Sequence, residues 1–134
     1  MRHYRSKLPS SADRVAAYPH LAAVLPAIVM PGMGVAGAAA AWLAGRHYSP
    51  LVDAQGRAAM EFQATLFLAG VGLFTVLTHG AGLPPAAPVP LLLALYFLSV
   101  ITPVFAATTT SRGEVWRYPL SLHLLDSDTP PARR

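Results

Sequence analysis

The sequence predicts an all-α fold: an integral membrane bundle of four helical segments. Two long runs, residues 15–45 and residues 63–111, contain no Lys, Arg, Asp or Glu. Uncharged apolar runs of about 18 or more residues are typical of helices that span a membrane. Charged residues make up only 12% of the chain, whereas soluble domains usually carry about 25%. The composition therefore argues against a soluble globular domain.

The first uncharged run predicts two short helices joined by a turn. A single helix over residues 15–43 would be about 43 Å long, against a hydrocarbon core of about 30 Å. Pro31 and Gly32 interrupt the run, because proline removes a backbone donor and glycine allows positive φ. We therefore expect a hairpin that turns at Pro31-Gly32. Its arms of about 14 residues fall short of a full crossing, so they either thin the bilayer or form a re-entrant pair. The alternative is one tilted crossing, with three spans in total.

The second half of the chain predicts two helices that are long enough to cross. Ser49 is a favourable N-cap and Pro50 a favourable first helical residue, so one helix begins here. The two helices are expected over residues 50–79 and 89–107, with a charge-free turn between them. Pro103 lies inside the last helix, where it predicts a kink and a freed carbonyl that neighbouring groups must satisfy.

The charge distribution predicts the topology. All ten Lys and Arg residues lie outside the two uncharged runs. With the hairpin, they all fall on one side of the membrane, and Lys and Arg are retained on the cytoplasmic side. We expect a multi-pass protein of the bacterial cytoplasmic (inner) membrane with both termini in the cytoplasm, and with Trp116 and Tyr118 as interfacial aromatics. The expected organisation is a basic N-terminal tail (1–13), a membrane helical domain (14–125) and a disordered C-terminal tail (126–134).

Five residues are candidates for contacts between helices or with a partner: His20, Asp53, Arg57, Glu61 and Gln63. Asp53, Arg57 and Glu61 are spaced by four residues on one helix face, either as a charge ladder or as a solvated entry turn. Glu61 needs Arg57, a backbone donor or a proton, and the alternative is a proton- or substrate-contacting site. Gln63 is expected to bond a neighbouring helix. For His20, an interfacial hydrogen bond is favoured over a cofactor ligand.

The sequence contains no pattern for catalysis or metal binding. There is no cysteine, and the five histidines are not at ligand spacing with one another or with Asp or Glu,. Nucleophile and phosphate-binding motifs are absent as well. We therefore expect no enzyme activity, no catalytic residue, no cofactor and no metal site. The net charge of +4 comes from residues beside apolar runs, which favours lipid headgroups over nucleic acid. The expected partners are the bilayer and other membrane subunits or further copies.

Several short motifs occur in an order that resembles a known family. They are Ser49-Pro50 with Asp53, Phe62-Gln63, Gly113 and Tyr118-Pro119. In these motifs the chain resembles a small bacterial membrane family of uncharacterised function, which is similar to the twenty-kilodalton subunit of the chloroplast inner-envelope import translocon (Tic-like). The resemblance covers roughly residues 16–125. It implies four spans with both termini on one side.

Two functions follow from these observations. The first is a non-enzymatic accessory or scaffold subunit of a membrane complex. It is favoured by the short hairpin and by the small residues Gly34, Gly37, Ala38 and Ala41, which would let the second arm pack closely. The alternative, implied by the resemblance, is a protein-translocation or channel component.

Overall fold

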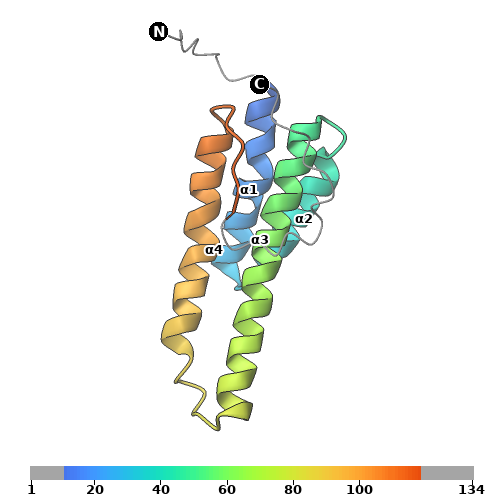
Figure 1. Ribbon diagram of the computed structural model, residues 1–134. Helices are drawn as coiled ribbons and strands as arrows, with labels where there is room; N and C mark the ends of the chain where they lie inside the picture. The colour runs from blue at the N-terminus through green and yellow to red at the C-terminus, as the bar shows by residue number, and fades with distance from the viewer. Residues whose placement is uncertain (1–10, 119–134) are drawn as a thin grey trace.

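The computed structural model describes residues 11–118 (Figure 1). Its elements are α1 (Ser11–Val29), α2 (Met33–Gly45), α3 (Pro50–Thr75), the π-helical turn η1 (Val76–Gly80) and α4 (Val89–Thr110). No strand occurs over residues 11–118, so the predicted all-α class is confirmed. Most of the two predicted tails lies outside the described residues, and the domain boundaries stay predictions.

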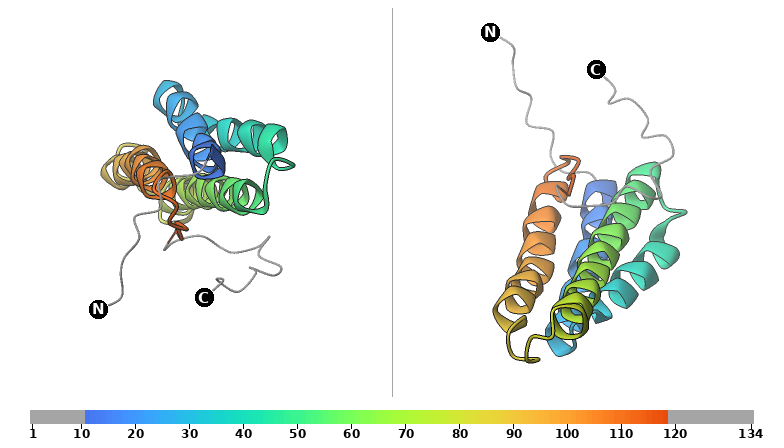
Figure 2. Two further views of the ribbon diagram at one scale, coloured as in Figure 1. Left: turned by 90° about the horizontal axis from the view of Figure 1, so that it is seen from above. Right: turned by 60° about the horizontal axis from the view of Figure 1, so that its bottom comes forward.

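The first uncharged run forms two helices, as predicted, with the break at residues 30–32. Gly32 has a φ of 90°, a left-handed conformation that glycine adopts without strain. Helices α1 and α2 then pack side by side as a hairpin (Figure 2). Gly37 of α2 lies so close to α1 that an added Cβ would collide with the backbone carbonyl of Ala22.

A proline explains this close approach. Pro26 has no N–H to bond the carbonyl of Ala22, four residues earlier, so that oxygen is left free on the surface of α1. Gly37 approaches the free oxygen with its Cα, and Cα–H···O contacts of this kind recur where helices pack closely. The hairpin is therefore held by a specific proline-glycine fit.

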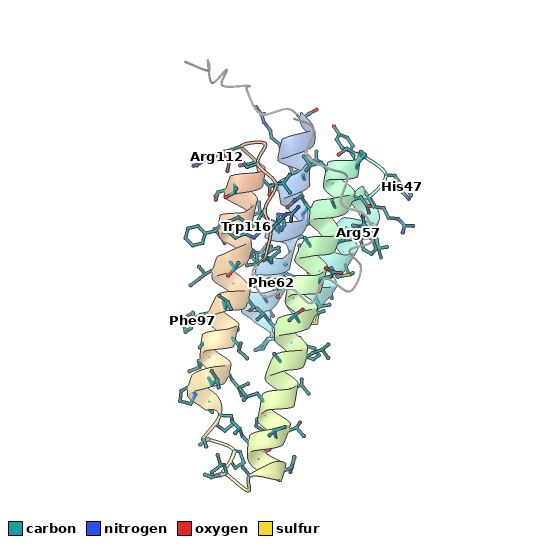
Figure 3. All side chains as sticks on the ribbon, in the orientation of Figure 1. His47, Arg57, Phe62, Phe97, Arg112 and Trp116 are labelled. Carbon is teal, nitrogen blue, oxygen red and sulfur yellow. The ribbon has the colours of Figure 1, made fainter. Side chains whose placement is uncertain are left out.

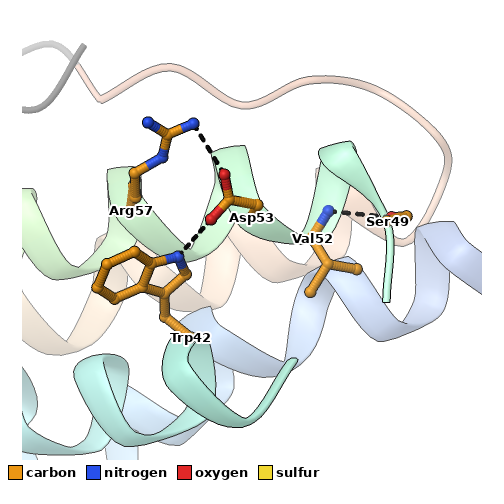
Figure 4. Close-up of polar contacts among 5 residues, drawn as sticks. All are labelled: Trp42, Ser49, Val52, Asp53 and Arg57. Atoms are coloured by element: carbon orange, nitrogen blue, oxygen red, sulfur yellow. Dashed lines mark hydrogen bonds and ion pairs between the residues drawn. The ribbon is translucent and has the colours of Figure 1, made fainter. Parts of the chain in front are cut away.

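Helix α3 begins where the sequence predicts. The Ser49 hydroxyl oxygen accepts a hydrogen bond from the backbone N–H of Val52 at 3.2 Å (Figure 4). Pro50 occupies the first helical position, where its missing N–H would have no partner in any case.

The first long helix runs continuously over Pro50–Gly80, within one residue of its predicted end, but its last turn is π-helical. The second runs beyond its predicted end, and at both ends hydroxyl groups bond carbonyls of their own helix. Helix α3 ends at Thr75 and continues as η1. The Thr78 hydroxyl donates to the Phe74 carbonyl at 2.7 Å, which is the acceptor that an α-helix would reserve for the Thr78 N–H. Helix α4 continues to Thr110, beyond the expected end at residue 107. There the Thr108 hydroxyl bonds a carbonyl of its own turn at 2.8 Å.

The bundle has two halves of unequal width (Figure 1). The turn at residues 30–32 reaches only to the level of Phe67 in α3, whose ring lies against Gly32. We call the part between this turn and the α2–α3 connection the proximal half. The part beyond the turn, with η1 and the loop over residues 81–88, is the distal half. Four helices form the proximal half, and only α3, η1 and α4 form the distal half.

Helix α1 is the centre of the proximal half and contacts α2, α3 and α4 (Figure 2). The core around it consists largely of alanines: Ala16, Ala23, Ala27, Ala38, Ala59 and Ala106. Phe62 is the largest side chain that is fully buried there. Small core residues allow helices to approach closely, which is how membrane helices commonly pack.

Two helices are long and apolar enough to cross a bilayer. One is the continuous segment Pro50–Gly80, and the other is α4. Helices α1 and α2 are also apolar but shorter. Four complete spans therefore stay a prediction.

Candidate functional site

A cluster of four polar side chains lies inside the proximal half. It consists of His20, Gln55, Thr110 and Tyr118, all buried, and we call it the polar cluster. His20 Nε2 lies 3.1 Å from Gln55 Oε1, and the Tyr118 hydroxyl lies 2.8 Å from His20 Nδ1. Thr110 donates to the same Gln55 oxygen at 3.4 Å. These partners fit a neutral imidazole that donates from Nε2 and accepts at Nδ1.

Tyr118 reaches this cluster from an extended segment that follows α4. We call residues 114–118 the strap; it runs back along the bundle between α3 and α4 (Figure 1). The Tyr118 ring stacks on Phe62 with centroids 4.2 Å apart and is only 2% exposed. Burial raises the pKa of the Tyr118 phenol far above its usual range, so the hydroxyl keeps its proton.

The structure corrects the expectation that Tyr118 is an interfacial aromatic. Its ring has a packing partner in Phe62 and its hydroxyl has an acceptor in His20. Both requirements of an amphipathic side chain are thus met inside the bundle rather than at a water interface. Trp116 (Figure 3) is half-buried with its ring centroid 6.1 Å from that of Tyr118, and its buried indole N–H has no hydrogen-bond partner among residues 11–118.

A second group of polar contacts joins the end of α2 to the start of α3 (Figure 4). Trp42 Nε1 donates to Asp53 at 2.7 Å, and Arg57 forms an ion pair with the other oxygen of the same carboxylate at 2.9 Å. The Arg46 guanidinium lies over the Trp42 ring at 5.8 Å, within the range of a cation–π interaction. Asp53 therefore ties two helices together as well as two neighbouring turns of α3.

Gln63 bonds α3 to α4 at a special position. Its Nε2 donates to the backbone carbonyl of Ser99 at 2.8 Å. Ser99 precedes Pro103 by four residues, so this is the carbonyl that Pro103 leaves without its helical N–H partner. Gln63 thus supplies, from the neighbouring helix, the donor that the proline removes.

The sequence-predicted residues do not form one site. His20 belongs to the polar cluster, Asp53 and Arg57 to the α2–α3 contact, and Gln63 to the α3–α4 contact. Glu61 is half-buried on α3, and its backbone carbonyl accepts a hydrogen bond from a threonine hydroxyl one turn later. Pro119, the last residue of the family motif, lies outside the described residues. None of these placements assigns a function, so the roles given to these residues stay predictions.

Sequence reasoning missed five partners: Trp42, Gln55, Tyr96, Ser99 and Thr110. Ser99 could have been found, because Pro103 identifies the carbonyl that needs a donor. Tyr96 donates to the Ile28 carbonyl at 3.3 Å, and nothing local in the sequence indicates that pair. Over residues 11–118 there is also no group of three His, Asp or Glu that could hold a metal ion.

An apolar groove opens in the distal half. It has a volume of about 640 Å³ and lies between α3 and α4, directly beyond the Pro31-Gly32 turn. Leu66, Phe67, Gly70, Val71, Phe74, Leu92, Leu93 and Leu95 line most of it. Its volume falls in the range of about 300–1,000 Å³ that ligand pockets commonly have.

A comparison with known protein families shows to which family the chain belongs. Residues 11–125 match the model of the MamF/MmsF family, described as a magnetosome magnetite crystal formation protein family. The chain belongs to this family. It is therefore a member of a bacterial membrane protein family whose description concerns magnetite formation. No curated protein and no solved structure matches the chain.

This match shows that the resemblance to the Tic-like family is wrong. The translocation or channel alternative, which came from that resemblance, loses its basis. The structure explains why the motifs misled. Ser49-Pro50 starts a helix, Asp53 joins two helices, and Gln63 caps a carbonyl freed by proline.

Proposed function

We propose that this chain is a non-enzymatic, multi-pass protein of the magnetosome membrane that supports magnetite formation as a structural subunit. The observation that carries the proposal is the family match over residues 11–125. It agrees with two helices that are long and apolar enough to cross a bilayer. The absence of enzyme activity, the crossing of the membrane more than once and the orientation in the membrane are all parts of this proposal.

The outer surface of the helices supports embedding in lipid. Large apolar side chains are exposed on all four α-helices: Leu21, Leu25 and Ile28 on α1, Leu43 on α2, Leu68 on α3, and Phe97 and Phe105 on α4. Phe97, for example, points away from the bundle (Figure 3). The polar cluster and Gln63 instead face inward. Large apolar side chains on the outside and polar groups kept inside the bundle are the pattern expected when the solvent is hydrocarbon.

The position of the charges supports one orientation. Arg46 lies in the α2–α3 connection, and Arg57 lies two turns into α3. Arg112 follows α4 at the same end of the bundle as His47 of that connection (Figure 3). The loop at the other end, over residues 81–88, has no charged residue. Lys and Arg are retained on the cytoplasmic side, so the proximal end is proposed to face the cytoplasm.

The same orientation bears on how the protein supports mineral growth. Hard metal cations are usually bound through carboxylate oxygens. The proposed orientation places the distal end on the side of the membrane opposite the cytoplasm. From Phe62 to Ser111 the chain has no Asp or Glu, so the distal end offers no carboxylate to a crystal that grows on that side. We therefore propose that the chain acts through the membrane and neighbouring subunits rather than as a mineral template.

The proposal is tested in a magnetite-forming bacterium that lacks its own members of this family. Expression of this chain is expected to place it in the magnetosome membrane fraction and to restore crystal size, measured by electron microscopy. A chain found in that membrane that leaves the crystals unchanged would contradict the role in magnetite formation.

The structural-subunit role is tested by the mass of the native assembly. After extraction in mild detergent, the chain is expected in a particle larger than one copy, either with itself or with other membrane proteins. A stable lone monomer that still restores crystal size would exclude that role.

A further inference from the structure

The α1–α2 hairpin does not reach as far along the bundle as the long helices α3 and α4. Thirteen residues separate Phe67, at the level of the hairpin turn, from the end of η1 at Gly80. At about 1.5 Å per residue this is about 20 Å. On α4, Tyr96 marks the level of the turn through its bond to the Ile28 carbonyl. Seven residues, or about 10 Å, separate Tyr96 from the start of the helix at Val89.

The hairpin therefore ends inside the thickness that the long helices cross. Helix α4 has 22 residues, about 33 Å, which matches a hydrocarbon core of about 30 Å. A turn that stops about 10 to 20 Å before the distal ends of α3 and α4 lies within that core. It is an interior turn, not a loop on the distal surface.

Several polar groups of the turn have partners within the protein. In hydrocarbon every backbone polar group needs a partner within the protein. Pro31 has no N–H, and the N–H groups of Met30 and Met33 bond carbonyls at 3.0 Å within the turn and the end of α1. The Tyr96 hydroxyl satisfies the Ile28 carbonyl, one of the last carbonyls of α1, which have no helical partner,. The exposed side chains here are apolar, with Met30 59% and Val29 85% exposed.

We infer that α1 and α2 form a re-entrant hairpin, so that the membrane domain is a wedge that fits a bilayer whose proximal leaflet is convex. Four helices occupy the proximal leaflet and two occupy most of the distal leaflet. The protein thus adds more area to the proximal leaflet, and a bilayer relieves that difference by bending with this leaflet outward. The inference rests on the proposed membrane embedding, and it adds the depth of the hairpin and a preferred lipid surface.

The apolar groove completes this wedge. Its wall at the proximal end is the Pro31-Gly32 turn itself, and the rest of it lies between the distal ends of α3 and α4. The occupant that we assign is acyl chains of the distal leaflet, because the groove is at their depth and its lining is mostly apolar, with Gln63, Tyr96 and Ser99 as the polar exceptions. At the opposite end, exposed Arg14, Arg46 and Arg112 fit the anionic headgroups of the proximal leaflet,.

The depth of the turn is tested with single cysteines, since the chain has none of its own. Tyr48→Cys, Met30→Cys and Leu83→Cys place exposed thiols at the proximal end, the hairpin turn and the distal loop. A membrane-impermeant maleimide is applied to sealed membrane vesicles of each orientation. We expect labelling at position 48 from the cytoplasmic face only and at position 83 from the other face only. Position 30 should react from neither face until detergent is added.

Each other outcome has a defined meaning. Labelling of position 30 from the same face as position 83 shows a complete crossing and overturns the wedge, while multi-pass embedding stands. Labelling of position 30 from the face of position 48 overturns the wedge as well. If all three positions react from both faces of sealed vesicles, the proposed embedding itself fails.

The curvature preference is tested by orientation in vesicles of two sizes. The Tyr48→Cys protein is reconstituted into small and large vesicles of the same anionic lipid mixture, and maleimide labelling is measured before and after detergent. We expect well over half of the protein to be labelled from outside in small vesicles, falling toward half in large ones. Leu83→Cys, the matched control, should show the complementary fraction. Equal fractions in both sizes would overturn the curvature preference.

Discussion

The proximal and distal halves of this bundle are stabilised in different ways. In the proximal half, alanines and glycines bring four helices close together, and inter-helix hydrogen bonds join them. In the distal half, α3 and α4 are separated by an apolar groove, and their outer side chains are exposed. Proximal substitutions should therefore act through the loss of specific contacts, whereas distal ones should be tolerated where lipid can replace a neighbour.

Two glycines test this contrast most directly. Gly37→Ala should lower the free energy of unfolding by about 1–3 kcal/mol, because the added methyl collides with the Ala22 carbonyl,. Gly72→Ala is the matched control: it lies in the distal part of α3, where a Cβ meets nothing within 4 Å. It should stabilise by about 0.5–1 kcal/mol through helix propensity. Thermal unfolding in detergent, followed by circular dichroism, compares the two, and equal shifts would remove the distinction between the halves.

Gln63 lies where the two halves meet and should show the next largest effect. Gln63→Leu should cost about 1–3 kcal/mol, because the Ser99 carbonyl loses its donor in an apolar setting,. In a Pro103→Ala background the restored backbone N–H can bond Ser99, so the same change should cost much less. A double-mutant cycle of unfolding free energies measures this coupling. Equal costs in both backgrounds would show that Gln63 does not replace the bond that Pro103 removes.

Tyr118 tests the polar cluster through pH. At about pH 8, Tyr118→Phe should lower stability by about 1 kcal/mol, through loss of the bond to His20,. Burial raises the pKa of the folded-state phenol, while the unfolded tyrosine titrates near its usual value of about 10. The stability that Tyr118 contributes is therefore fully present below about pH 10 and is lost as the pH rises further.

The phenylalanine variant lacks this loss, so the two proteins should converge in melting temperature toward about pH 11. Melting curves of both proteins across this range make the comparison. A constant difference between them would mean that Tyr118 is accessible to water in the folded state.

The smallest effect is expected at the charged end of the proximal half. Asp53→Asn removes the ion pair with Arg57 but keeps an oxygen that can accept from Trp42. Both partners of the pair are about one-third exposed, with 31% for each side chain, and exposed pairs contribute about 0–1 kcal/mol. Chemical unfolding at low and high salt should show a loss of a few tenths of a kcal/mol that shrinks with salt. A loss above that of Gln63→Leu would show that this contact is a main support of the bundle.

The family assignment shows how far short motifs can be trusted in such a chain. Ser49-Pro50 and Gln63 recur where a helix must start or a freed carbonyl must be satisfied, so they report helix chemistry more than function. The wrong resemblance to a Tic-like family came from these short motifs, whereas the correct all-α class came from the two long uncharged runs. It was the match over residues 11–125 as a whole that distinguished one family from the other.

The sequence by itself determined the positions of the helices and of the charged end. Pro31-Gly32, Ser49-Pro50 and the uncharged runs act on their own neighbours in the chain, through missing donors, allowed φ angles and the solubility of side chains in lipid. The tertiary structure decided the pairs His20–Tyr118 and Gln63–Ser99 and the level of α3, at Phe67, that the hairpin turn reaches. The members of these pairs are 98 and 36 positions apart. No local pattern records which distant donor will meet a buried acceptor, because only the packing of the helices brings the two groups together.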